Sequence, residues 1–326
     1  MPSDRTTFST GIATFPQRLR ALPAVRGITR NFAITRRHLQ VVLGLLWLLD
    51  GALQAQSFMF TRGFATEVLA PVGEGQPGFV SGPVHLASTV IAAHPVVWNV
   101  PFAAIQLLLG FGLLVPRTAR LTLAASIAWA LGVWYVGEGL AGMASGHASL
   151  IIGAPGSALI YALLAAAAWP RSDESRRDGS RERPAPWLPF AWAGVWVGAA
   201  VFQALPGQNT GTAVASTLTA GTEGAPAWLA SLDSSVGSWA AGHGLLLVLV
   251  LVAAEALIGL GALSRRSKRT AVALGLALTL AFWVLGQDLG ALYTDQATDP
   301  NSGPLLALMA IALLARSRGT VSGKRP

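Results

Sequence analysis

Carboxyl groups inside long apolar segments are the side chains of this sequence best placed to do chemistry. Glu255 lies near the middle of the apolar segment 244–263, and Asp50 lies in the apolar segment 39–56. An ionised carboxylate in hydrocarbon costs several kcal/mol, so such a group is protonated, paired or part of a functional site. For Glu255, two interpretations stay open: a hydrogen bond to a neighbouring helix, or a proton or ligand site.

Further polar side chains lie in or at the ends of other apolar segments, and we treat them as candidate ligand or proton sites. They are Gln106, Gln54, Gln203, Glu138 and Asp288, with Trp134 and Trp283 close to the last two in sequence. One interpretation is a set of helix contacts at a wet membrane interface. The other is a polar vestibule that opens to the outside and has the two tryptophans as walls.

Two histidines, His94 and His243, each begin an apolar segment, and we consider them as candidate metal ligands. The chain has no cysteine, which excludes disulfides, thiolate metal sites and cysteine nucleophiles. No H-x-x-x-H, E-x-x-H or methionine-rich spacing is present. Helix capping or an interfacial hydrogen bond is therefore favoured for these histidines, with copper binding as the alternative.

The elements that must position these side chains are membrane helices. Of the 326 residues, 52% are hydrophobic and only 12% are charged, which is about half the charge of a soluble domain. Eight apolar segments approach the length of about 20 residues that a spanning helix needs. They lie at 39–56, 97–115, 121–141, 153–169, 188–204, 244–263, 271–290 and 303–315. The fold class predicted is an all-α integral membrane protein with eight transmembrane helices.

The positive charges predict the orientation of these helices. Every Lys and Arg except Arg62 lies in the tails, in the linker after the fourth segment, or in the turns after the second and sixth segments. Because cytoplasmic loops collect Lys and Arg, we expect a cell-membrane protein with both termini in the cytoplasm. The net charge of +8 therefore reflects topology and gives no support for nucleic-acid binding.

The two halves of the chain resemble each other at a fixed offset of 149 residues. Matched pairs include Trp47 and Trp196, His94 and His243, and Trp134 and Trp283. The pairs Glu74 and Glu223, Gly75 and Gly224, and Pro77 and Pro226 extend the match into the loops. Since each unit has an even number of spans, we expect two parallel four-helix repeats.

This organisation divides the chain into five parts. They are a basic tail at 1–38, a first unit at 39–169 with a long outer loop at 57–96, a charged linker at 170–186, a second unit at 187–315 with a long outer loop at 205–242, and a tail at 316–326.

Segments of both units resemble the DoxX-like family of four-helix membrane proteins. The residues that carry the resemblance are VLGLLWLLDGALQ at 42–54, FAAIQLLLGFGLL at 102–114 and LVAAEALIGLGAL at 251–263, the last two each followed by a basic turn. The resemblance implies a membrane subunit of a redox assembly that engages quinone or a partner enzyme.

From these observations we expect a multi-pass accessory subunit of a membrane redox or envelope assembly, not catalytic on its own. It would bind a lipophilic ligand, quinone or lipid, or a membrane or extracytoplasmic partner protein. Two alternatives remain open: a transporter or handling protein for a small molecule or copper that uses the outer histidines and carboxylates, and a non-catalytic membrane scaffold.

Overall fold

The computed structural model describes residues 34–170, 185–219 and 224–315, and every regular element within these ranges is a helix. The prediction of an all-α fold is confirmed for these ranges. Most of the predicted basic tails and linker, as well as Glu223, lie outside them.

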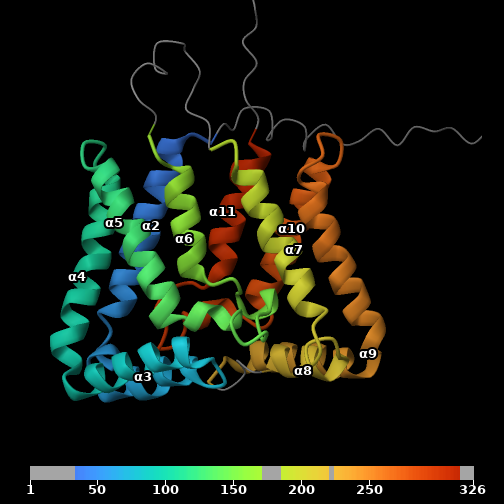
Figure 1. Ribbon diagram of the computed structural model, residues 1–326, viewed down its shortest axis with the longest axis horizontal. Coiled ribbons are helices and arrows are strands. Elements are labelled where there is room, and N and C mark those ends of the chain that lie inside the picture. The colour runs from blue at the N-terminus through green and yellow to red at the C-terminus, as the bar shows by residue number, and fades with distance from the viewer. Residues whose placement is uncertain (1–33, 171–184, 220–223, 316–326) are drawn as a thin grey trace, which may run out of the picture.

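The first half is a bundle of four upright helices (Figure 1). These are α2 (Arg36–Gln54), α4 (Pro95–Leu114), α5 (Ala119–Gly132) and α6 (Ser157–Ala167). Helix α5 continues without a break as the π-helical turn η4 (Val133–Gly137). Helix α2 packs against α4 and α6, and α5 packs against α6.

The second half contains four further upright helices. These are α7 (Leu188–Gln203), the end of α9 (Ala227–Gly261), α10 (Lys268–Val284) and α11 (Ser302–Leu314). Helix α7 packs against α9, and α10 packs against α11. Helix α11 also contacts α6 and α7, so α6 and α11 join the halves at the centre of the molecule (Figure 1).

Helices also occupy the segments that were expected to be long outer loops. The first segment contains the short helices η1 (Ser57–Phe60), η2 (Phe64–Leu69) and η3 (Ala70–Gly73), followed by α3 (Gly78–Ala93). The second contains α8 (Gly211–Thr219) and the start of α9. Together they form a layer across one end of the bundle (Figure 1). Gly244, at φ 43° and ψ −127°, bends α9 between this layer and its upright part.

Among the described residues, three helices are long and apolar enough to cross a membrane: Pro95–Leu114, Ala119–Gly137 and Ala227–Gly261. Other predicted spans are shorter, because α6 has 11 residues and α11 has 13. At 1.5 Å per residue these two rise roughly 16 to 20 Å, against a hydrocarbon thickness of about 30 Å.

A largely irregular segment precedes each of these short helices: residues 138–156 precede α6, and residues 285–301 precede α11. The helices predicted over 121–141 and 271–290 end early, at Gly137 and Val284. The helix predicted over 153–169 begins late, at Ser157. The cause is backbone geometry that an α-helix cannot accommodate: Leu140 has φ 57°, Leu285 after α10 is extended at ψ 125°, and Gly156 before α6 has φ 105° and ψ 141°. Tryptophan side chains satisfy part of this backbone, since the indole N–H of Trp134 donates to the carbonyl of Pro155 at 2.7 Å.

Arginine side chains at the start of α2 cap the ends of two neighbouring helices. Arg37 donates to the carbonyl oxygens of Leu113 and Leu114, the first at 2.8 Å, and Arg36 donates to that of Trp169. These carbonyls have no partner within their own helices, so the guanidinium groups satisfy them and offset the negative end of the helix dipoles. Helix α2 is thereby fixed against α4 and α6 at this end of the bundle.

Candidate functional site

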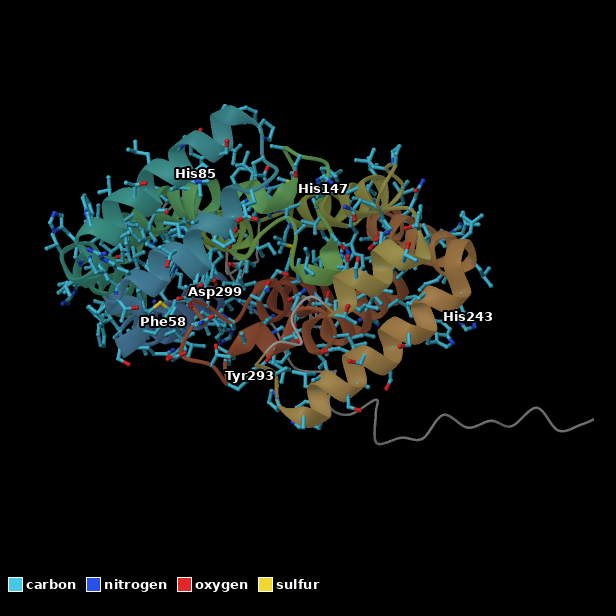
Figure 2. The ribbon with its side chains drawn as sticks, turned by 90° about the horizontal axis from the view of Figure 1, so that it is seen from below. Phe58, His85, His147, His243, Tyr293 and Asp299 are labelled. Carbon is cyan, nitrogen blue, oxygen red and sulfur yellow. The ribbon has the colours of Figure 1, made fainter. Side chains whose placement is uncertain are left out.

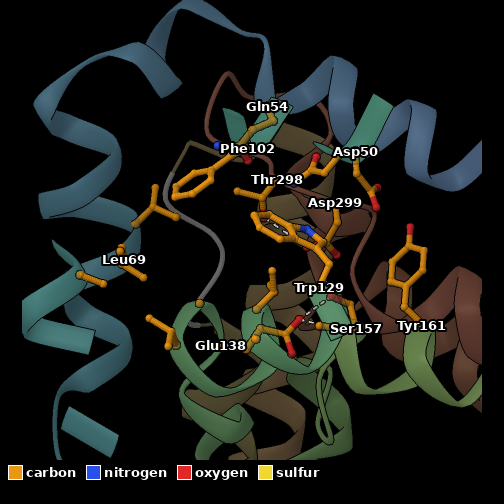
Figure 3. A pocket seen from close by; sticks show the side chains of 18 of the residues that line it. Asp50, Gln54, Leu69, Phe102, Trp129, Glu138, Ser157, Tyr161, Thr298 and Asp299 are labelled. Carbon is orange, nitrogen blue, oxygen red and sulfur yellow. Dashed lines mark hydrogen bonds between the residues drawn. The ribbon is translucent and has the colours of Figure 1, made fainter. Parts of the chain in front are cut away.

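A cavity of about 320 Å³ lies inside the first half of the protein (Figure 3). Its walls come from α2, α4, α5, η4 and α6, and residues of η2 and α3 close it on the side of the outer layer. Thr298 and Asp299 also line it, although they belong to the irregular segment before α11 in the second half. The volume lies within the range of about 300 to 1,000 Å³ that is typical of ligand pockets.

Most of the cavity wall is apolar, and much of it is aromatic. Trp47 and Tyr161 pack with their ring centroids 4.4 Å apart, and Phe102 and Trp129 pack at 5.7 Å. Phe64 adds a fifth ring from η2. Such a wall favours an apolar or flat ligand, because burial of its surface and ring contacts both contribute to binding.

Carboxyl groups from three different elements face this apolar space. Asp50 comes from α2, Glu138 follows η4, and Asp299 precedes α11. In Figure 3 the hydroxyl of Tyr161 points toward the carboxyl of Asp50. Asp50 and Tyr161 are both only 2% exposed.

Glu138 is held firmly by the start of α6. One of its oxygens, Oε1, accepts hydrogen bonds from Ser157 Oγ at 2.5 Å and from the backbone N–H of Ala158 at 3.0 Å. A carboxylate at a helix N-terminus satisfies an otherwise unpaired N–H and is stabilised by the helix dipole. The other oxygen, Oε2, has no protein partner.

Several polar atoms of the cavity wall are buried without a hydrogen-bond partner. They are Asp50 Oδ1, Gln106 Oε1, Trp129 Nε1, Glu138 Oε2 and Tyr161 OH. Leaving a buried polar atom unpaired costs about 1 to 3 kcal/mol, so a cluster of them in one cavity calls for an explanation. A ligand that offers complementary groups would supply one.

Burial also affects the acidic residue contributed by the second half. It raises the pKa of Asp299 above its ordinary value, although the hydrogen bond from the backbone N–H of Asn301, at 2.7 Å, opposes the shift. The carboxyl of Asp299 therefore takes up a proton more readily than an exposed aspartate does.

The structure brings four of the predicted site residues together around this cavity: Asp50, Gln54, Gln106 and Glu138. Gln54 is also bonded to Asn99, whose side-chain amide donates to the Gln54 carbonyl at 2.8 Å. The cavity differs from the vestibule that the sequence predicts, because it lies within the first half and neither Trp134 nor Trp283 lines it. Trp134 supports it from outside by binding the Pro155 carbonyl.

The other predicted site residues lie in the second half, away from the cavity. Gln203 donates to the carbonyl of Gln208 at 2.6 Å, and Trp283 donates to that of Pro300 at 2.9 Å. Glu255 is 1% exposed in α9, and its Oε2 has no partner. Asp288 is buried near Asp233 of α9.

The histidines proposed as metal ligands lie on separate parts of the molecule. His94 joins α3 to α4, whereas His243 stacks on Trp239 in α9, and these helices form opposite edges of the bundle (Figure 1). Two other histidines, His85 and His147, also lie apart from each other and from His243 (Figure 2). Within the described ranges, no three His, Asp or Glu side chains form a group that could hold a metal ion.

Sequence reasoning missed four polar residues of the site: Ser157, Tyr161, Thr298 and Asp299. The only signal for Ser157 was its place at the start of an apolar segment, where a hydroxyl can bind an acid. Tyr161 is the only tyrosine within a predicted apolar segment other than Tyr135. No signal placed Asp299 in the first half, because nothing in its own segment specifies a contact more than 100 residues away.

Replacing Glu138 with glutamine should leave the stability of the protein nearly unchanged, because an amide oxygen can accept the same two hydrogen bonds. Gln287 already does so in the second half, where its Oε1 accepts from Gly303 N at 3.0 Å. Glu138→Leu removes both bonds and should cost about 2 kcal/mol. Thermal unfolding of the purified variants in detergent checks this, and equal losses for Gln and Leu would contradict it.

Replacing Glu255 with leucine should not lower the stability of the protein. No described group donates to its free oxygen, so the substitution leaves no partner unpaired and removes a buried polar atom. The expected change in the free energy of unfolding is within about 1 kcal/mol of zero. A clear loss for Glu255→Leu, with Glu255→Gln unaffected, would show that the carboxyl has a structural partner after all.

No family model, curated protein or solved structure matches this chain.

Proposed function

We propose that this chain is a multi-pass membrane protein that binds a lipophilic small molecule in the cavity of its first half. The observation that carries the proposal is the cavity itself, whose apolar and aromatic wall bears five unpartnered polar atoms. A ligand with a polar end and an apolar body would satisfy both features.

The position of the cavity supports a ligand that arrives from the lipid phase. Ala128 and Gly132 line it one helical turn apart on α5, and both residues are exposed. Because both side chains are small, the wall is thin at this point. A lipophilic molecule could enter here without crossing water.

The membrane topology that we propose has eight helices and both termini in the cytoplasm. Three helices have the length and hydropathy of spans, and the sorting of Lys and Arg supports the orientation. The short helices α6 and α11 would cross with the help of the irregular segments beside them. Irregular backbone is tolerated at membrane depth where protein covers it.

We further propose that the two halves are parallel repeats, and matching hydrogen bonds support this. Trp134 binds the carbonyl of Pro155, as Trp283 binds that of Pro300. Thr118 Oγ1 donates to the carbonyl of Gly112 at 2.7 Å. Ser267 Oγ, 149 positions later, donates to that of Gly261 at 2.9 Å.

The proposed repeat differs from an ungapped one before its last helix. Glu138 and Ser157 are 19 residues apart, whereas Gln287 and Ser302, bonded in the same way, are 15 apart. The offset therefore changes from 149 to 145 residues at α11. Asp50 then corresponds to Ala199 at the offset of 149, and Tyr161 corresponds to Leu306 at the offset of 145, so the acidic cavity is a specialisation of the first half.

The DoxX-like resemblance and the cavity together favour an accessory subunit of a membrane redox or envelope assembly. Quinone and lipid both have the apolar body that the cavity would accept. A partner protein of the same membrane would then deliver or use the ligand.

Photolabelling of the full-length protein tests ligand binding directly. The probe is decanol carrying a diazirine on its chain, and labelled peptides are mapped by mass spectrometry. We expect saturable labelling at the cavity residues of α2, α5 and η4, reduced by an excess of decylubiquinone or of unlabelled decanol. Labelling that is confined to the lipid-facing surface and does not saturate would refute the proposal.

The proposed orientation makes a separate prediction. A cysteine introduced at Ser175, in the linker, should resist a membrane-impermeant maleimide in intact cells and react after the membrane is permeabilised. A cysteine at Ser81, in α3 of the outer layer, should react in intact cells. The reverse pattern of labelling would contradict the proposed orientation.

A further inference from the structure

The acidic groups of the cavity converge from both halves of the protein. Asp50 and Glu138 belong to the first half, and Asp299 belongs to the second (Figure 3). Asp299 is close enough to interact electrostatically with both of the others. Three carboxyl groups therefore share one apolar space.

No positive charge of the protein balances these groups at the cavity wall. Among the described residues that line the cavity there is no Lys, Arg or His. Placing like charges together away from water is costly, so the carboxyl groups must either hold protons or face a cation.

One neutral side chain independently indicates that the cavity is built for a ligand. Gln106 is 8% exposed, and its Oε1 atom has no hydrogen-bond partner among the described residues. Gln106 lines the same cavity as the carboxyl groups. The unpartnered oxygens of Asp50, Gln106 and Glu138 are acceptors, so these three atoms lack a hydrogen-bond donor, whereas Trp129 Nε1 is itself a donor.

The aromatic part of the wall has the chemistry that attracts an organic cation. Trp47, Phe102 and Trp129 present rings to the cavity. The face of an aromatic ring attracts an ammonium group, and this attraction is strongest where water is excluded. The same rings provide contact area for an alkyl chain or another apolar group.

We propose that the ligand of this cavity is a lipophilic ammonium ion, an amine with one positive charge and an apolar body. Its N–H groups would donate to the free acceptors of Asp50, Gln106 and Glu138, and Asp299 would complete the negative environment. This inference rests on the proposed function, since it specifies the polar end of the lipophilic molecule.

Asp299 makes the cavity depend on both halves of the chain. It is held by two bonds: its Oδ1 accepts from the backbone N–H of Asn301 at 2.7 Å, and its Oδ2 accepts from Thr298 Oγ1 at 3.1 Å. An asparagine can keep the first bond through its own Oδ1. Asp299→Asn therefore removes the charge and preserves the geometry, which makes it the informative substitution.

The test compares two probes that differ only in their polar end. Decylamine, protonated at pH 7, and decanol carry the same diazirine, and the concentration for half-maximal labelling of the cavity peptides is measured for the full-length protein in detergent. We expect the amine to label at a concentration at least tenfold lower than the alcohol. Asp299→Asn should reduce this preference at least threefold and leave alcohol labelling unchanged, whereas Asp295→Asn, at an exposed position of the same segment, should change neither.

Each other outcome overturns a defined part of the account. Equal labelling by both probes, or stronger labelling by the alcohol, would refute the ammonium ligand and leave the lipophilic site intact. Absence of cavity labelling by either probe would refute the proposed function as well. If the Asp299→Asn variant keeps the full preference for the amine, the claim that the second half contributes to the site is wrong. Matching elution of each variant and the wild type on size exclusion establishes that the comparison concerns folded protein.

Discussion

Gly156→Ala should destabilise the protein by about 3 kcal/mol or more, the largest effect on stability that we expect from a single methyl group. Gly156 precedes α6 with φ 105° and ψ 141°, a conformation that residues with a side chain rarely adopt. A Cβ atom there would also collide with Glu138 Oε2, and it would lie 3.0 Å from Trp134 Cδ1. The substitution would therefore displace the carboxyl group that holds the start of α6.

A glycine that lines the cavity, Gly132, provides the control. Gly132, at the end of α5, has ordinary helical geometry, and a Cβ atom there meets nothing within 4 Å. Gly132→Ala should thus stabilise the protein slightly, by roughly 0.5 to 1 kcal/mol, because alanine loses less backbone freedom on folding. Differential scanning fluorimetry of both variants in detergent gives the comparison. Equal melting temperatures for Gly156→Ala and the wild type would contradict the geometry around α6.

Gly132→Phe should reduce labelling of the cavity by the decanol probe at least tenfold. The position lies on the thin wall between the cavity and the outer surface, and its open surroundings leave space for a larger side chain. A phenyl ring would fill part of the cavity or block its opening, and either outcome excludes a ligand. The measurement is the concentration of probe that gives half-maximal labelling.

The matched control for this variant is Gly198→Phe. Gly198 lies within α7, a Cβ atom there also meets nothing within 4 Å, and the residue does not line the cavity of the first half. This variant should label like the wild type. A loss of labelling in both variants would mean that bulk on the membrane surface, rather than occlusion of the cavity, is responsible.

The sequence predicted the helical class because long apolar segments leave few alternatives once water is excluded. It also identified Asp50 and Glu138 as candidates, because an ionised carboxyl group in an apolar segment costs several kcal/mol unless it is paired or functional. Their meeting in one cavity required the packing of α2 against α6, which hydropathy alone does not specify. Glu255, which the same argument identified, lies in the second half and does not line the cavity.

The ends of the helices were harder to predict than their existence. Segment 121–141 is apolar to its end, yet the backbone turns at Leu140 and Ala141, both with positive φ. Hydropathy depends on how apolar a segment is and not on its dihedral angles. Hydropathy alone therefore predicts a helix for a buried irregular segment. The same limit hid Asp299, whose role depends on how the segment before α11 folds across to the first half.

The most direct test of the central claim is an experimental density map of the full-length chain in lipid nanodiscs with decanol or decylamine present. We predict non-protein density in the first half, in contact with Trp129 and with at least one of Asp50, Glu138 and Asp299. A cavity that is well resolved but closed by its own side chains, with the polar atoms of Asp50, Gln106 and Tyr161 paired among themselves, would contradict the account.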